Sequence, residues 1–133
     1  LEVGSVATDF EHRSFAQEIQ LCKRYYEQFD SNGLSEAPFG VGYFEANNNL
    51  RAVVPLHEKR ADVSFSSTAA STFASMNTNN MPAGGAISLY KTGKKAAIIS
   101  LVLSSDVTSG DGRAGILCSQ SSTEATLKFD SEL

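Results

Sequence analysis

The sequence contains little cysteine, histidine and proline, and it contains no tryptophan. Only two cysteines, two histidines and three prolines occur among 133 residues. A disulfide-rich scaffold is therefore excluded, and a chain of this length buries enough apolar surface to fold as one domain without covalent cross-links. Cys22 and Cys118 permit one disulfide but do not require it, and we expect both to be buried free thiols.

Positive charge and long apolar runs are also scarce. The chain has 11 Lys and Arg residues against 15 Asp and Glu, for a formal net charge of −4. Nucleic-acid binding needs clustered basic side chains, so we expect no nucleic-acid partner. The longest apolar run, Ala96 to Leu103, is far shorter than the roughly 20 residues of a membrane-spanning helix, so we expect no membrane insertion.

Neutral polar residues are abundant instead. Ser, Thr, Asn and Gln together number 37, more than the 26 charged residues. Because polar side chains lie mostly at the surface of a folded domain, this surplus predicts a surface rich in hydroxyl and amide groups. Such a surface is suited to contacts with neutral, hydrogen-bonding molecules.

The clearest element in the sequence is one short helix near the start. Ser14 followed by Gln17 is a capping-box pattern, in which each side chain bonds to the other residue's backbone. Phe15, Ile19 and Cys22 then recur with helical spacing and form one apolar stripe. We therefore expect a helix from about Phe15 to Cys22.

The rest of the chain has the period of two that is typical of β-strands. Apolar and polar residues alternate in Arg60–Ser66 and in Glu124–Asp130, and we interpret Ser66–Asn80 as a strand-like crossing with a long loop. The pattern predicts an all-β fold: an antiparallel, jelly-roll-like β-sandwich with one short N-terminal α-helix. The other expected strands are Lys23–Phe29, Val41–Glu45, Leu50–Leu56, Ile87–Tyr90, Lys95–Leu103 and Gly115–Ser119.

One glycine motif matches the dinucleotide-binding fingerprint by its letters alone. Gly110, Gly112 and Gly115 have the correct spacing, but the residues after them are predicted to form a strand. The fingerprint requires a helix N-terminus at that point to bind a pyrophosphate. We therefore interpret the segment as a hairpin turn and expect no nucleotide cofactor.

The candidate catalytic and metal-binding residues do not form a recognisable set. His12 and His57 have no second histidine or cysteine at zinc-ligand spacing, and no sequence pattern marks a nucleophile. Glu45 and Glu58 would suit glycosidase chemistry only if they lay about 5 to 10 Å apart. We therefore expect no enzymatic activity, no catalytic residue, no cofactor and no metal.

The best candidate for ligand binding is an aromatic pair followed by three asparagines. Tyr43 and Phe44 precede Asn47–Asn49, and Tyr90 stands at a predicted turn. An aromatic face with amide donors is suited to a hydroxyl-rich sugar, although a plain hairpin turn would also explain the asparagines. The candidate ligand-binding residues are Tyr43, Asn47, Asn48, Asn49 and Tyr90.

The string LEVGSVATDFEHRSFAQEIQLCKRYY resembles a segment of tailed-bacteriophage tail fibre and other receptor-binding virion proteins. In that family a similar phrase leads from a β-sandwich, through a short helix, into a C-terminal head domain. Leu50–Pro55 and Phe129–Leu133 resemble further elements of the same domain. The matching residues at the start are Leu1, Glu2, Val3, Gly4, Ala7, Thr8, Phe10, Glu11, Arg13, Glu18, Leu21, Cys22, Arg24, Tyr25 and Tyr26.

The resemblance implies a non-enzymatic module at the distal end of a virion tail fibre, assembled in the cytoplasm of the bacterial host. Residues 1–13 would be a linker from a preceding domain, and residues 14–133 would be the head domain. The implied partners are a host cell-surface glycan or protein and two further copies in a homotrimer. The alternative is a structural domain that trimerises, caps or decorates the virion without contacting the receptor.

The sequence also suggests where copies of the chain would meet. Ile98 and Val102 alternate with the core residues of Lys95–Leu103 and give this strand a second apolar face. We expect this face to lie near the symmetry axis of the trimer.

Overall fold

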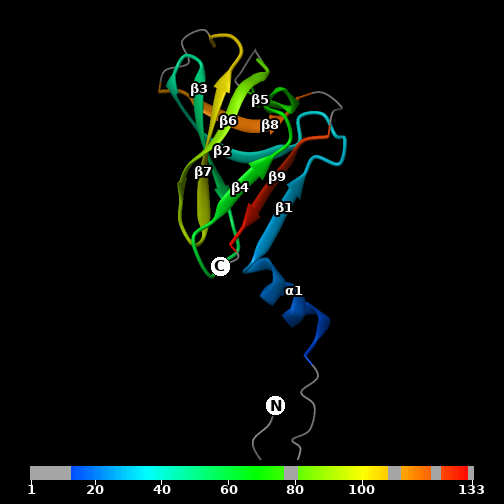
Figure 1. Cartoon of the computed structure of the whole chain (residues 1–133). Coiled ribbons are helices and arrows are strands. Elements are labelled where there is room, and N and C mark those ends of the chain that lie inside the picture. The colour runs from blue at the N-terminus through cyan, green and yellow to red at the C-terminus, as the bar shows by residue number, and fades with distance from the viewer. Residues whose placement is uncertain (1–12, 77–80, 108–111, 121–123, 132–133) are drawn as a thin grey trace, which may run out of the picture.

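The computed structural model describes residues 13–76, 81–107, 112–120 and 124–131. It confirms an all-β antiparallel sandwich with one short α-helix (Figure 1). Predictions that concern residues 1–12, Gly110 or Asp111, and with them His12 and almost all of the expected linker, lie outside the described residues. The elements are α1 (Phe15–Lys23), β1 (Tyr26–Asp30), β2 (Pro38–Ala46), β3 (Asn49–Pro55), β4 (Ser64–Ser67), η1 (Ala70–Thr72), β5 (Phe73–Met76), β6 (Gly84–Thr92), β7 (Ala96–Leu103), β8 (Ala114–Ser119) and β9 (Thr126–Asp130).

The strands form two antiparallel sheets. The smaller sheet has the order β1-β9-β4, and the larger sheet has the order β5-β8-β2-β3-β7-β6 and curls into a half-barrel. In Figure 1, α1 projects from the end of the sandwich at which the described C-terminal residues lie. The chain therefore enters the domain from one end, and the turn between β2 and β3 lies toward the other.

The core lies between the two sheets, and strand alternation explains its composition. Every second residue of β3 and β7 points inward and is fully buried, and β9 contributes the facing side chains. Each buried Leu, Ile, Val or Phe stabilises the fold by about 1.5 to 3 kcal/mol. The main contributors from these three strands are Leu50, Val54, Ile99, Leu101, Leu127 and Phe129.

The predicted helix is confirmed, including its cap. The Ser14 hydroxyl accepts a hydrogen bond from the Gln17 backbone at 3.3 Å, and the Gln17 side chain accepts one from the Ser14 backbone at 2.9 Å. The helix ends at Lys23, so the next strand begins at Tyr26 and not at Lys23 as predicted.

The strand predicted for Arg60–Ser66 is too long, because only its second half belongs to β4. The reason is the backbone pairing just before it. The N–H of Lys59 donates to the Lys94 carbonyl and that of Arg60 to the Arg24 carbonyl, so this segment bridges other parts of the chain. Its apolar alternation nevertheless persists, since Val63 is buried.

The two cysteines are both free, but only one of them is buried. Burial raises the pKa of the Cys118 thiol to about 11, and the negative charge of Glu36 adds to this. The expectation of burial is wrong for Cys22, which is exposed because its side of α1 faces away from the domain. The segment after Gly112 is the strand β8, as predicted, so the context of a dinucleotide fingerprint is absent there.

Candidate functional site

The six-stranded sheet has an exposed face that carries large hydrophobic side chains. Val41 is 65% exposed, Tyr43 54% and Tyr90 47%, although exposed tyrosine and valine are normally scattered singly over a protein surface. Because strand neighbours alternate between faces, these residues share the side that points away from the core. We call this surface the outer face, formed by Val41, Tyr43, Arg51, Val53, Tyr90, Ile98, Ser100 and Val102.

Arg51 lies at the centre of the outer face, between the two tyrosines. It pairs directly with Tyr43 across β2 and β3, and its guanidinium carbon lies 3.6 Å from the ring centroid of Tyr90. Its Nε and Nη2 donate to Oε2 of Glu45 at 2.8 and 2.6 Å. These contacts leave the Arg51 side chain only 13% exposed and fix the guanidinium against the Tyr90 ring.

Asn49 extends this polar network toward the β2–β3 turn. Its Nδ2 donates to Oε2 of Glu45 at 3.1 Å, and its Oδ1 accepts from the Ser100 hydroxyl at 2.9 Å. Ser100 in turn pairs with Arg51 across β3 and β7. The charges of Arg51 and Glu45 compensate each other, so the centre of the outer face combines aromatic rings with a pre-ordered network of no net charge.

The structure brings three of the five predicted ligand-binding residues close to this network. Tyr43 and Tyr90 contact or face Arg51, and Asn49 bonds to its carboxylate partner. Asn47 and Asn48 lie instead in the turn beyond β2, where their carbonyls accept from the backbones of Val107 and Leu103.

Sequence reasoning missed Arg51, and it considered Glu45 only as a possible catalytic carboxylate beside Glu58 and not as the partner of Arg51. A signal for Arg51 was present, because Arg51 alternates with buried Leu50 and Ala52 and therefore had to share a face with Tyr43 across the hairpin. The contact between Arg51 and Tyr90 had no such signal, because β7 lies between their strands.

The outer face also contains the residues expected at a symmetry axis. Val41, Val53 and Ile98 form one apolar row across β2, β3 and β7, next to the row formed by Tyr43, Arg51 and Ser100. Two predictions made separately, for ligand binding and for association of copies, therefore concern the same surface.

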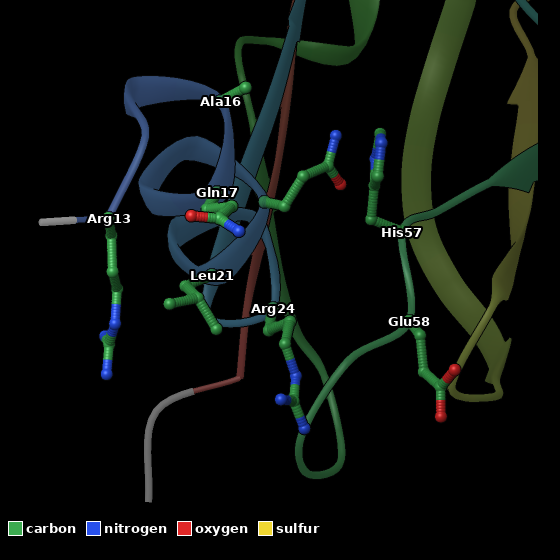
Figure 2. A pocket seen from close by; sticks show the side chains of 8 residues that line it. Arg13, Ala16, Gln17, Leu21, Arg24, His57 and Glu58 are labelled. Atoms are coloured by element: carbon green, nitrogen blue, oxygen red, sulfur yellow. The ribbon is translucent and has the colours of Figure 1, made fainter. Parts of the chain in front are cut away.

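A second region of interest is a groove beside α1. It has a volume of about 1120 Å³ and opens between the helix and the segment after β3 (Figure 2). Polar and charged side chains predominate in its lining. We call it the α1 groove, lined by Arg13, Ala16, Gln17, Gln20, Leu21, Arg24, His57 and Glu58.

Next to the α1 groove lies a buried ionic cluster that the sequence did not reveal. The Glu27 carboxylate accepts hydrogen bonds from Nδ1 of His57 at 2.7 Å and from the His57 backbone at 3.0 Å. Nζ of Lys59, fully buried, lies 3.2 Å from Oε2 of Glu27 and donates to the Lys23 carbonyl at 2.7 Å. The cluster thus connects the end of α1 to β1 and to the segment after β3.

The surroundings of Glu27 keep its carboxylate ionised. Burial alone would raise its pKa, but the hydrogen bonds from His57 and the contacts with Lys59 outweigh burial, so the pKa of Glu27 is lower than the usual 4.5. The Glu27 charge therefore stabilises the folded chain.

This lowered pKa predicts how stability depends on pH. Because the pKa of Glu27 is lower in the folded chain than in the unfolded chain, its contribution is complete above about pH 4.5 and decreases as the pH falls below that value. Urea unfolding between pH 6 and pH 3 should show this loss, and Glu27→Gln should reduce its slope. Glu58→Gln is the control, since Glu58 is exposed, and an equal slope in both variants would contradict the prediction.

The remaining candidates for chemistry are dispersed. Glu45 belongs to β2, next to the turn that leads into β3, and Glu58 follows the far end of β3. Glu45 pairs with Arg51, and Glu58 pairs with Lys95. Within the described residues, no three His, Cys, Asp or Glu side chains gather as a metal site would require. No helix in the same part of the chain is long and apolar enough to cross a membrane.

Comparisons with protein-family models, curated proteins and solved structures find no match for this chain. None of these comparisons therefore bears on what the outer face binds.

Proposed function

We propose that this chain is a receptor-binding head domain at the distal end of a phage tail fibre, and that it binds a host cell-surface glycan through the outer face. The observation that carries the ligand proposal is the guanidinium of Arg51, fixed between two exposed tyrosines. The assignment to a virion rests on the sequence resemblance alone. The domain acts by binding and not by catalysis.

The chemistry of the outer face favours a neutral, hydroxyl-rich ligand. Tyr43 offers a ring face against which the C–H side of a sugar packs, whereas Arg51 occupies one face of the Tyr90 ring. The hydroxyls of both tyrosines donate or accept hydrogen bonds. The charges of Glu45 and Arg51 already compensate each other, so this pair offers an anionic ligand little additional attraction. Because the network is ordered before binding, little conformational entropy is lost when a ligand binds.

The second candidate function is structural: the domain trimerises or caps the fibre without contacting a receptor. The apolar row formed by Val41, Val53 and Ile98 favours it, because exposed apolar rows are typical of protein interfaces. Deleting residues 34–133 from the fibre separates the two functions. Lost adsorption by an intact trimeric fibre supports receptor binding, and lost assembly supports the structural role.

Alanine variants of the outer face test the ligand proposal. Tyr43→Ala, Arg51→Ala and Tyr90→Ala should each weaken binding to the glycan selected on an array by about 1 to 3 kcal/mol, as expected for aromatic and arginine hot spots. Calorimetry on folded variants measures this loss. Tyr26→Ala is the control, because Tyr26 is similarly exposed but belongs to the other sheet. Unchanged affinity in all three variants would exclude the outer face as the glycan-binding site.

A further inference from the structure

Helix α1 turns its apolar side away from the domain to which it belongs. The side of α1 that lines the α1 groove is mainly polar, with Gln17, Gln20 and Arg24, but it also carries the apolar Ala16 and Leu21 (Figure 2). A helix on the surface of a protein normally turns its apolar side toward the core and its polar side toward water. Here the stripe of Phe15, Ile19 and Cys22 must lie on the other side.

The geometry of an α-helix confirms the separation of the two sides. With 3.6 residues per turn, the centre of the stripe and the centre of the groove-lining residues lie about 160° apart around the helix axis. Phe15 is accordingly 81% exposed and Ile19 37% exposed. None of the nine residues of α1, all of which the structure describes, is buried.

The orientation of α1 is fixed at its C-terminal end. Lys59 donates from the interior to the Lys23 carbonyl, and the next carbonyl, that of Arg24, accepts from the Arg60 backbone at 3.2 Å and from the Ser131 hydroxyl at 2.6 Å. The last carbonyls of the helix are thus held by the body of the domain. The helix cannot rotate to bury its stripe without breaking these bonds.

A helix of this length does not derive its stability from its own backbone. Isolated helices shorter than about 12 to 15 residues are marginal in water, so most helices in proteins are stabilised by packing of an apolar face. The apolar face of α1 receives no such packing from the described part of its own chain. Within the described residues, nothing therefore covers the stripe.

The stripe has the spacing of a heptad repeat, and charged residues flank it in complementary positions. Ile19 occupies position a, and Phe15 and Cys22 occupy position d. Glu18 is then at position g and Lys23 at the following position e, the two positions that form ion pairs between parallel helices. Within one chain Glu18 lies 3.7 Å from Arg13, an exposed contact that contributes little.

We propose that copies of this chain associate through α1, with the helices parallel and the stripes packed against each other. Glu18 of one copy then pairs with Lys23 of the next, and the repulsion between like residues disfavours other registers. This association goes beyond the proposed function, because it does not depend on whether the outer face binds a glycan. It is also distinct from the association expected near Ile98 and Val102.

Cross-linking through Cys22 tests the parallel orientation. In parallel helices the Cys22 side chains of two copies lie beside each other, so mild copper–phenanthroline oxidation of the full chain should give a disulfide-linked dimer. Cys22→Ser should abolish the dimer, whereas Cys118→Ser should not. The matched control moves the thiol to the groove side of α1, by Gln20→Cys combined with Cys22→Ser. Equal dimer yield from this control would show random collision and overturn the proposal.

The stripe is tested by one variant at its centre. Ile19→Asp should slow the Cys22 cross-linking by about tenfold or more, as expected for loss of a central apolar contact. Circular dichroism checks that the β-sandwich remains folded. Unchanged cross-linking in Ile19→Asp would mean that another surface brings the cysteines together, and the proposal would be wrong.

The charge pair is tested by mixing two variants. Glu18→Lys carries lysine at both flanking positions, and Lys23→Glu carries glutamate at both, so each variant alone repels its own copies. Sedimentation should show weaker association of each variant alone than of the unchanged chain, and stronger association in the equimolar mixture. Mixing changes the sequence of neither variant, so stronger association in the mixture than in either variant alone cannot come from a change in helix stability. A mixture no stronger than its components, or an unchanged chain that stays monomeric at every concentration, overturns the proposal.

Discussion

Replacing Gly42 by alanine is expected to lower the free energy of unfolding by about 3 kcal/mol, at the upper end of the cost of overpacking. Gly42 lies in β2 directly opposite Ala52 in β3. A Cβ atom at this position would overlap the carbonyl oxygen of Arg51 and come within 2.7 Å of the Cα of Ala52. Both are backbone atoms, so no side-chain rotation relieves the overlap and the two strands must move apart.

A second glycine provides the matched control for this change. A Cβ atom on Gly85, in β6, would meet its nearest neighbour, the Val102 carbonyl oxygen, at 3.5 Å, an ordinary contact. Gly85→Ala should therefore change stability by less than about 0.5 kcal/mol, and urea unfolding measures both variants. Equal stability of the two variants would show that β2 and β3 do not approach so closely. A displaced β2 would also disturb Tyr43 and Arg51, so Gly42→Ala should weaken ligand binding as well.

Replacing Lys59 by methionine is expected to destabilise the chain by about 3 kcal/mol, because it removes one partner of a buried ion pair. Methionine retains the apolar volume of the side chain but leaves the ionised Glu27 with less compensation. It also removes the donor to the Lys23 carbonyl, so the end of α1 loses one of its attachments. Thermal or urea unfolding measures the loss of stability.

Two further variants show whether the buried charge is the cause. Lys95→Met removes an exposed lysine whose partner, Glu58, is also exposed, and it should have almost no effect. The double variant Glu27→Gln with Lys59→Met removes both charges and should recover part of the lost stability. A loss in Lys59→Met no larger than that in Lys95→Met would contradict the proposed role of the cluster.

Local patterns were sufficient for most of the elements of this fold, because such patterns depend on neighbours in the chain. The capping box at Ser14 and Gln17 and the helical spacing of the stripe predicted α1 to within one residue at its end. Strand alternation correctly predicted that Leu127 and Phe129 are buried. The same patterns located most of the strands, but the predicted start of β1 and the predicted length of β4 were wrong. Backbone bonds to distant segments determine where β4 begins. The elements η1 and β5, in a segment expected to be a strand-like crossing with a long loop, were not predicted separately.

These local patterns did not predict contacts between residues that are far apart in the sequence. Nothing in the sequence indicated that Glu27, His57 and Lys59 meet, or that Arg51 packs on Tyr90 across an intervening strand. Such contacts depend on the order of strands in the sheets, and that order is decided by the packing of the whole core. The local pattern also gave a wrong prediction for Cys22. Its position on an apolar stripe suggested a buried side chain, but the side chain is exposed.

The sequence by itself determined an all-β fold with one short helix, because hydrophobic period and capping are local properties. It also determined which residues could form an apolar stripe on α1 and a tyrosine-bearing strand face. Only the tertiary structure decided where these surfaces point. It turns the stripe away from the domain, since the carbonyls at the end of α1 are bound from within, and it joins Tyr43, Arg51 and Tyr90 into one outer face, since β2, β3, β7 and β6 are neighbours in one sheet.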